Sequence, residues 1–223
     1  MSIKTLLSWS GGKDCAFALF ELQANHSEYT VSGLLTSITA DYDRVSMHGF
    51  PTSLLKQQAI ALNLPLHQLT INARDTKDDY EQKMSAILAT VKADGVSAVA
   101  FGDIFLEDLR KYREANLAKI NMQAVFPLWN RSTAELAQQF IAAGFKAIIT
   151  CVDTQALDAS FAGREFDASF LADLPNGVDP CGENGEFHSF VYAGPIFNNA
   201  IAFSRGESIL RDGRYCFFDL QEV

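Results

Sequence analysis

The sequence of 223 residues lacks several patterns that mark familiar classes of protein. Its four cysteines, Cys15, Cys151, Cys181 and Cys216, lie far apart and form no CxxC pair, which argues against a zinc site or a thioredoxin-like motif. No apolar run approaches the roughly 20 residues of a membrane-spanning helix, and residues 1–9 lack a signal-peptide pattern. We therefore expect a soluble, cytoplasmic protein with reduced thiols and no membrane partner.

Positive charge is also scarce. The chain has 18 Lys and Arg residues against 27 Asp and Glu residues, a formal net charge of −9. A nucleic-acid-binding surface normally carries a basic stripe; the nearest approach is Arg110, Lys111 and Arg113, which we interpret as a solvated helix face. The sequence thus argues against tRNA and DNA as partners and leaves a homo-oligomer open. The 48% of hydrophobic residues is enough for a substantial core.

Strand-like and helix-like patterns alternate through the first half of the chain. The clearest helix is predicted over residues 77–94, where apolar residues recur at helical spacing. This alternation predicts an α/β fold, in which a parallel sheet has helices on both faces. A turn after Phe126 predicts a domain boundary, with an ATP-binding domain of residues 1–126 and a smaller α+β C-terminal substrate or catalytic domain of residues 127–223.

A paired glycine separates the first apolar run, residues 3–9, from the second, residues 16–22. The stretch between them is Ser10-Gly11-Gly12-Lys13-Asp14-Cys15. Glycines let the backbone turn tightly and bring amide N–H groups close to a ligand, and a helix that begins near Asp14 favours an anion at its N-terminus. Ser10 would add a hydroxyl and Lys13 a positive charge. The alternative interpretation is a plain strand-to-helix turn.

This stretch matches neither the Walker loop GxxxxGK[ST] nor the dinucleotide fingerprint GxGxxG. It resembles the SGGxDS signature of PP-loop ATP pyrophosphatases, which split ATP between the α and β phosphates and activate a substrate as its adenylate. Cys15 stands where the signature has its final serine. Either one hydroxyl contact is therefore missing, or the thiol faces the core.

Polar residues also follow two later strand patterns. Thr36 follows the strand predicted at residues 29–35, and Gly102 and Asp103 follow the one at residues 98–101. Ligands of doubly wound sheets lie at the carboxyl ends of the strands, so these residues are candidates to face a nucleotide. Asp103 could bind a ribose hydroxyl, a metal ion or an amine, or could simply cap the next helix.

A short loop over residues 41–50 contains Arg44, Met47 and His48. Arg44 can bind phosphate or carboxylate, and His48 can exchange a proton near neutral pH. The alternative interpretation is a solvated loop without a function.

A second cluster of reactive groups occurs late in the chain. Within ten residues it gathers Asp179, Cys181, Glu183, Glu186 and His188, interleaved with glycines. Like charges that are buried together raise each other's pKa values, and proteins tend to carry such clusters at functional sites. The alternative is a polar turn that leads into a strand. We expect the diglycine turn and this acidic stretch to line opposite walls of one crevice.

Four motifs together resemble the diphthine–ammonia ligase family of ATP-binding proteins, in order and over nearly the whole chain. They are Ser10-Gly11-Gly12-Lys13-Asp14, Ser46-Met47-His48, Gly102-Asp103, and Cys181-Gly182-Glu183-Asn184-Gly185-Glu186-Phe187-His188-Ser189-Phe190-Val191 followed by Gly194-Pro195. The pairing of SGGKD with CGExGE is the most specific part. The resemblance implies a Rossmann-like domain of the HUP, or adenine nucleotide α-hydrolase, type and a smaller C-terminal domain.

The resemblance also implies a ligase reaction in two steps. ATP adenylates a substrate carboxylate with release of pyrophosphate, and ammonia then displaces AMP to give an amide. ATP and Mg²⁺ are the implied cofactors, with the ion near Asp14. The candidate ATP-binding residues are Ser10, Gly11, Gly12, Lys13, Asp14, Cys15, Thr36, Gly102 and Asp103. The candidate substrate-binding residues are Arg44, Met47 and His48, and the candidate catalytic residues are Cys181, Glu183, Glu186 and His188.

The short chain and the His188-Ser189 pair resemble bacterial members of the family. In these the acceptor is expected to be another carboxylate, either small or protein-borne. Two other functions stay open at this point. One is a PP-loop sulfur-transfer enzyme acting on tRNA, with Cys181 as the sulfur carrier; the acidic charge and the missing CxxC count against it. The other is a non-catalytic adenine-nucleotide sensor.

Overall fold

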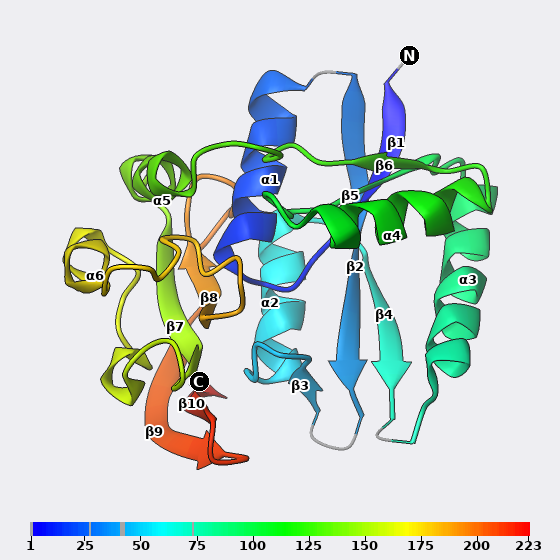
Figure 1. The fold of residues 1–223 in the computed structure, drawn as a ribbon. Helices are drawn as coiled ribbons and strands as arrows, with labels where there is room; N and C mark the ends of the chain where they lie inside the picture. Colours follow the sequence, from blue (N-terminus) through cyan, green and yellow to red (C-terminus); the bar gives the residue numbers. More distant parts are fainter. Residues whose placement is uncertain (1, 27, 41–42, 73) are drawn as a thin grey trace.

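The computed structural model describes residues 2–26, 28–40, 43–72 and 74–223. Two positions of the predicted loop 41–50, residues 41 and 42, lie outside the described residues. Six strands form a first sheet in the order β3-β2-β1-β5-β6, with β4 paired to β2 (Figure 1). They are β1 (Ile3–Ser8), β2 (Tyr29–Thr39), β3 (Arg44–Val45), β4 (Leu66–Ile71), β5 (Ala98–Ala100) and β6 (Gln123–Val125).

This sheet is mostly parallel. β1 runs parallel to β2 and β5, β2 to β4, and β5 to β6, whereas β3 is antiparallel to β2. The parallel pairs are connected through helices, as parallel strands require. Those helices are α1 (Lys13–Asn25), α2 (Thr52–Leu62), α3 (Lys77–Ala93) and α4 (Glu107–Ala118).

Alternate residues of the strands face two different apolar clusters, because side chains alternate across a strand. Leu7 on β1 packs in the cluster that contains residues of α1 and α2. Its neighbour Leu6 packs in the cluster that contains Leu88 of α3 and Leu117 of α4. The sheet therefore has helices on both faces, and the predicted α/β, HUP-like fold is confirmed.

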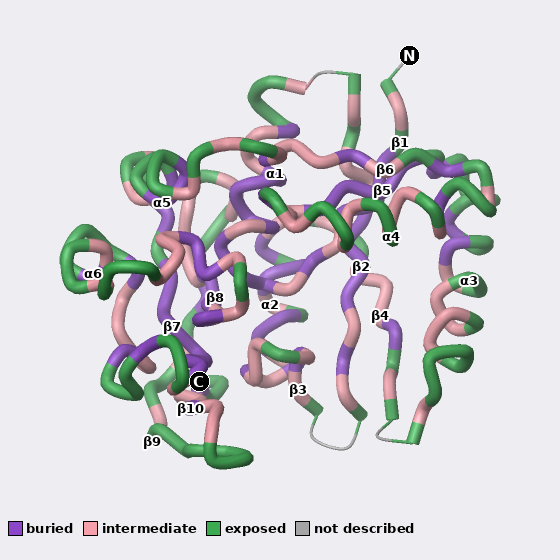
Figure 2. Tube along the Cα trace, in the orientation of Figure 1, coloured by how far each residue is buried: buried purple, intermediate pink, exposed green. Residues whose placement is uncertain are grey.

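The second sheet is antiparallel, in the order β8-β7-β10-β9. Its strands are β7 (Lys146–Asp153), β8 (Phe187–Ala193), β9 (Phe203–Arg211) and β10 (Tyr215–Glu222). The helices of this region are α5 (Thr133–Ala142), α6 (Ala168–Asp173) and the 3₁₀ helix η1 (Ala159–Phe161). One apolar cluster continues from β1 through α1 into β7 and β8, and Figure 2 shows buried segments in this region, with β9 largely exposed.

Strand β8 lies directly beside the glycine loop that follows β1. The N–H of Val191 donates to the carbonyl of Gly11 at 2.9 Å. The buried amide of Gln58, on α2, donates to the carbonyl oxygens of both Gly11 and Val191, at 3.0 and 2.6 Å. The edge of the second sheet is thereby fixed against the loop. None of the helices in the described part of the chain combines the length and hydropathy needed to cross a membrane.

Candidate active site

Both glycines of the loop after β1 are required by close packing. Gly11 has φ +77°, a conformation that favours glycine. A Cβ at Gly11 would lie 2.6 Å from Cζ of Phe50, and one at Gly12 would lie 2.6 Å from Cε1 of His48. The Ser10 hydroxyl accepts a hydrogen bond from the N–H of Gly12 at 3.3 Å, which closes the turn.

Cys15 takes the place of the signature serine and faces the core. Its thiol donates to the carbonyl of Gly12 at 3.1 Å and lies 3.5 Å from the Ser10 hydroxyl. Burial raises the pKa of the Cys15 thiol, so the group stays neutral. It acts as an internal tie between the loop and the first turn of α1.

The N-terminus of α1 points into this loop without a side-chain cap. Gly12 is the N-cap residue and makes no side-chain hydrogen bond there. The first turn of a helix has N–H groups without intrahelical partners, and the helix dipole adds partial positive charge. The turn is therefore suited to an anion, as the sequence predicts.

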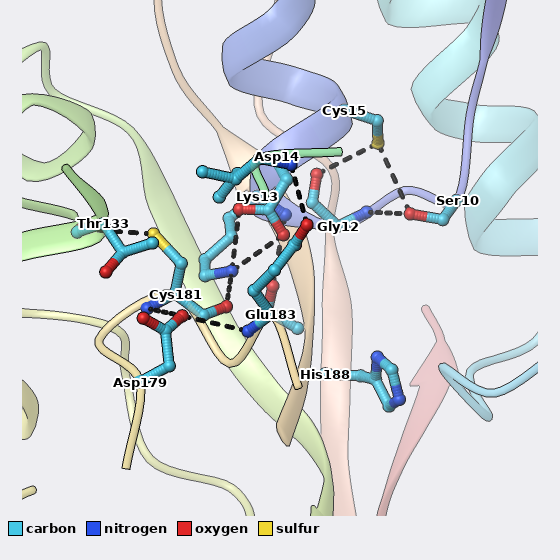
Figure 3. Close-up of polar contacts among 12 residues, drawn as sticks. Ser10, Gly12, Lys13, Asp14, Cys15, Thr133, Asp179, Cys181, Glu183 and His188 are labelled. Atoms are coloured by element: carbon cyan, nitrogen blue, oxygen red, sulfur yellow. Dashed lines mark hydrogen bonds and ion pairs between the residues drawn. The ribbon is translucent and has the colours of Figure 1, made fainter. Parts of the chain in front are cut away.

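Lys13 is turned towards the C-terminal half of the chain. Its buried ammonium donates to both carboxylate oxygens of Asp14 at 2.8 Å and to the carbonyl of Cys181 (Figure 3). Burial is the largest influence and lowers the pKa of Lys13, but the charge and hydrogen bond of Asp14, with the charges of Cys181 and Glu183, together outweigh it and the pKa is raised. Burial also raises the pKa of Asp14, against the opposing effect of Lys13. The diglycine turn and the acidic stretch are thus in direct contact.

Glu183 reaches from the acidic stretch to the loop between β5 and α4. Its Oε1 accepts from the N–H of Ile104 at 2.7 Å, and Figure 3 shows the side chain extending towards the first turn of α1. Burial, opposed by the Ile104 hydrogen bond, raises the pKa of Glu183 to about 7. Glu183 can therefore gain and lose a proton near neutral pH, which suits a general base.

Glu186 and Cys181 hold the acidic stretch together. One oxygen of Glu186 accepts from the N–H of Asp179 at 3.1 Å, and the other from the N–H of Asn184 at 3.0 Å. The Cys181 thiol donates to the carbonyl of Thr133 at 3.3 Å. Burial raises the pKa of Cys181 to about 12. The geometry therefore gives both side chains a loop-building role, and the catalytic role expected from the sequence stays a prediction.

The ring of His188 packs beside that of His48 and is not among the hydrogen-bond partners of the Lys13 ammonium. The two ring centroids lie 4.8 Å apart, and Nδ1 of His48 lies 2.9 Å from the carbonyl of Ser189. Since a carbonyl only accepts, Nδ1 of His48 carries the proton. Burial lowers the pKa of His48 to about 4 and that of His188 to about 3, so both rings are neutral at pH 7.

A cavity of about 360 Å³ lies at the carboxyl ends of β1, β2 and β5, between α3 and α4. Its lining includes Ser10 at one end and Thr36, Ser37 and Phe101 further along. This volume lies within the usual range of ligand pockets. Thr36 is inside β2, not beyond its end as predicted, because the strand continues to Thr39. Its buried hydroxyl has no hydrogen-bond partner among the described residues, as expected of a group that binds a ligand.

The cavity and the acidic stretch contact different parts of the glycine loop: the cavity is lined by Ser10, and the acidic stretch binds Lys13. Among the described residues, the cavity lining includes none of the stretch from Cys181 to His188. A hollow of about 10 Å³ is lined by Lys13, Asp14 and Cys181, among others. The two stretches therefore touch each other, and the large cavity opens from the Ser10 end of the loop.

Arg113 is a cavity residue that the sequence analysis missed. Its side chain is only 27% exposed and pairs with Asp103: Nη2 donates to Oδ1 at 3.1 Å, and Nε lies 2.9 Å from Oδ2. Its guanidinium lies 4.2 Å from the ring centroid of Phe101. Our interpretation of a solvated helix face is therefore wrong for Arg113. No sequence spacing reveals this position, because it depends on how the loop before α4 folds back.

Gly102 serves a close approach between backbones. A Cβ at this position would lie 2.8 Å from the carbonyl carbon of Asp14 and 2.9 Å from the amide nitrogen of Cys15. The absence of a side chain lets the segment after β5 pass against the first turn of α1. Gly102 thereby brings Asp103 and the N-terminus of α1 together.

Two other candidate residues precede α2: Arg44 lies on β3, which the sequence did not predict, and Met47 lies in the loop that follows β3. The guanidinium of Arg44 is engaged with Oδ1 of Asp219 at 2.8 Å and with the carbonyl of Gly49 at 2.6 Å. Met47 has φ +64° and a residue exposure of 61%. Arg44 thus ties the loop to β10, and the expected contact of either residue with substrate stays a prediction.

A magnesium site can be tested against the side chains present. Among the described residues, no three His, Cys, Asp or Glu side chains converge as ligands. Besides burial, the charge of Asp14 raises the pKa of Glu183, so the two carboxylates are near neighbours. Mg²⁺ in nucleotide sites needs only one or two carboxylates besides phosphates and water. Asp14, in the first turn of α1, fits that limited role.

Comparison with known proteins agrees with this architecture. The model of the diphthamide synthase N-terminal domain matches residues 3–123, and that of the C-terminal domain matches residues 132–220. The diphthine–ammonia ligase of Danio rerio is 28% identical over 90% of this chain and 86% of its own length. The human one is 26% identical over 90% and 83%, and that of Schizosaccharomyces pombe is 22% identical over 98% and 39%. The chain therefore belongs to the diphthamide synthase family.

Proposed function

We propose that the protein is an ATP-dependent ligase that adenylates a carboxylate and converts it into an amide with ammonia. ATP is cleaved to AMP and pyrophosphate in this reaction. The observation that carries the proposal is the contact between the glycine loop and the stretch containing Glu183, next to a nucleotide-sized cavity. The relatives named as diphthine–ammonia ligases support the same class of reaction.

In this proposal residues 1–126 bind ATP. The adenosine occupies the cavity, where the Thr36 hydroxyl gains a hydrogen-bond partner and Arg113 forms part of the wall. The phosphates extend past Ser10 to the first-turn amides of α1, which stabilise the negative charge. Asp14 would hold Mg²⁺, which would supply charge neutralisation for the departing pyrophosphate.

Residues 127–223 supply the groups that act on the acceptor in this proposal. A carboxylate oxygen of the acceptor attacks the α phosphorus, and pyrophosphate leaves. Glu183, with its pKa raised to about 7, takes a proton from ammonium, and the ammonia formed attacks the acyl carbon. The bond from that carbon to the AMP oxygen breaks and the added nitrogen releases one proton to water, which gives an amide and AMP. The acceptor is a carboxylate, either small or protein-borne.

The test is to incubate the protein with ATP, Mg²⁺, an ammonium salt and pools of carboxylate metabolites or proteins. We expect AMP and pyrophosphate in equal amounts, and incorporation of ¹⁵N from ammonium into an amide. Formation of ADP would contradict cleavage at the α phosphate. Tight ATP binding without pyrophosphate release in any pool would favour a nucleotide sensor.

A further inference from the structure

The three donor positions of the Lys13 ammonium are all engaged within the protein. A lysine ammonium has three N–H groups. In this structure they are matched by the two oxygens of Asp14 and by the carbonyl of Cys181. The side chain is 5% exposed, and Nζ lies 5.4 Å from the ring centroid of Phe187 and 5.8 Å from that of Phe166. Little room is left for a phosphate oxygen beside this ammonium.

The backbone of Lys13 is also turned to the C-terminal half. Its N–H donates to the hydroxyl of Ser189, on β8, at 3.1 Å. The loop amides that remain for an anion are therefore those of its neighbours. The ammonium and the backbone N–H of Lys13 therefore both donate to residues in the half of the chain that follows Phe126.

The carbonyl that Lys13 binds belongs to the same tight loop as Glu183. Within this loop, one carboxylate oxygen of Asp179 accepts from the N–H groups of Cys181 and Glu183, both at 3.0 Å. The position of the Cys181 carbonyl is therefore coupled to the backbone of Glu183, because the two residues belong to one short segment held by shared hydrogen bonds. At the other end, the Glu183 carboxylate is held by Ile104.

We propose that Lys13 is a positioning residue, which fixes the Cys181–Glu186 loop against the ATP-binding loop and is not a phosphate ligand. The ammonium holds the loop from one side, and Ile104 holds the Glu183 side chain from the other. This inference revises the phosphate-binding role expected for Lys13 from the sequence, and its kinetic test rests on the proposed function. Without the ammonium, Asp14 and the Cys181 carbonyl lose their partner and the loop loses its anchor. Displacement of a reacting group by about 1 Å can cost roughly 100-fold in rate.

Lys13→Met is the variant of choice, because methionine keeps an unbranched apolar stem among the phenylalanine rings. Lys92→Met is the matched control, since Lys92 also donates to a backbone carbonyl, that of Ile120, at an exposed position. Three quantities are measured for each variant: the Kd of Mg-ATP by calorimetry, amide hydrogen exchange over residues 179–186, and the kcat and KM for AMP formation.

For Lys13→Met we expect a Kd for ATP within about threefold of the wild type, because no bond to phosphate is lost. Exchange over residues 179–186 should be at least about tenfold faster, and kcat should fall at least about tenfold with an unchanged KM for ATP. Lys92→Met should match the wild type in all three. A loss of ATP affinity beyond about tenfold, with unchanged exchange in the loop, would overturn the proposal, since a charged hydrogen bond is worth that much.

Ser189→Ala is a second, milder variant that removes only the acceptor for the Lys13 N–H. It should speed exchange over residues 179–186 without weakening ATP binding. If Lys13→Met does not fold, as judged by its melting curve, unchanged exchange and unchanged kcat in Ser189→Ala would count against the proposal. Binding and exchange need no acceptor, so they decide the role of Lys13 even if the wild type forms no AMP and the proposed function fails.

Discussion

His48 and His188 place their imidazole rings with centroids 4.8 Å apart, one on the loop before α2 and the other on β8. The backbone carbonyl of Ser189 accepts a hydrogen bond from Nδ1 of His48, which keeps the His48 ring in one tautomer. The pKa of each is lowered chiefly by burial, to about 4 and about 3. The folded protein therefore holds two neutral rings close together, with His48 next to Gly12, and two protonated rings at this distance would repel one another.

This pair predicts a loss of stability in mild acid. The folded pKa values lie below the unfolded value of about 6.5, so the unfolded state binds more protons as the pH falls. The stabilising contribution is complete above pH 6.5 and is lost as the pH falls towards 4 and 3. The His48→Gln/His188→Gln double variant should show a weaker pH dependence, by at most about 1.4 kcal/mol per pH unit for each histidine. Urea unfolding between pH 7 and pH 4.5 measures how the free energy of unfolding changes with pH. Equal slopes of that free energy against pH in the variant and the wild type would refute the prediction.

Glu183→Gln should separate catalysis from ATP binding. Glutamine keeps an oxygen for the Ile104 N–H but cannot accept a proton as a base, so turnover should fall about 10²- to 10⁴-fold. With a pKa of about 7, the wild-type rate should rise with pH through neutrality and then level off, and the variant should lose this rise. The Kd for ATP should stay within about threefold.

Glu114→Gln, on α4 and paired with Arg110 at the surface, is the control for Glu183→Gln. It should keep both the rate and the pH profile of the wild type. Full turnover in Glu183→Gln would remove Glu183 from the mechanism.

Thr36→Val should stabilise the protein and weaken nucleotide binding. The Thr36 hydroxyl is buried without a partner among the described residues, and such a group costs about 1–3 kcal/mol. Its removal should raise the melting temperature of the free protein. ATP affinity should fall about tenfold, because a hydrogen bond to the bound nucleotide is lost.

Thr52→Val is the matched control for Thr36→Val. Its hydroxyl is likewise buried without a partner among the described residues, but Thr52 is not part of the cavity lining. It should raise the melting temperature and leave ATP affinity unchanged. An equal loss of affinity in both variants, measured by calorimetry, would show that Thr36 does not bind the nucleotide.

Cys181→Ser should keep ATP cleavage within about threefold of the wild type. The thiol is neutral, with a pKa of about 12, and a serine hydroxyl can replace its hydrogen bond to Thr133, worth about 1 kcal/mol. Cys151→Ser, at another buried thiol, controls for the general effect of the substitution. Loss of all activity in Cys181→Ser alone would revive the sulfur-transfer alternative, in which a thiolate is required.

The sequence by itself determined the alternation of strands and helices in the first half of the chain and the glycine loop, but not β3, β9 or β10. Helix α3 ends at Ala93 and Gly95 follows with φ +87°, close to the predicted end, because apolar spacing and glycine preferences act over a few neighbouring residues. The loop from Ser10 to Cys15 was equally recognisable as a tight turn between a strand and a helix, because adjacent glycines favour such a turn. Alternation of such local signals is enough to specify a parallel sheet with helices on both faces.

Only the tertiary structure decided which partners the polar groups choose. Lys13 was expected at a phosphate and lies instead on the carbonyl of Cys181; Arg44 pairs with Asp219, and Arg113 joins the cavity wall. A long charged side chain can reach in many directions, and its choice depends on which distant segment packs beside it and how much water that packing removes. Those quantities arise only when the second sheet docks against the glycine loop, so no pattern along the chain contains them.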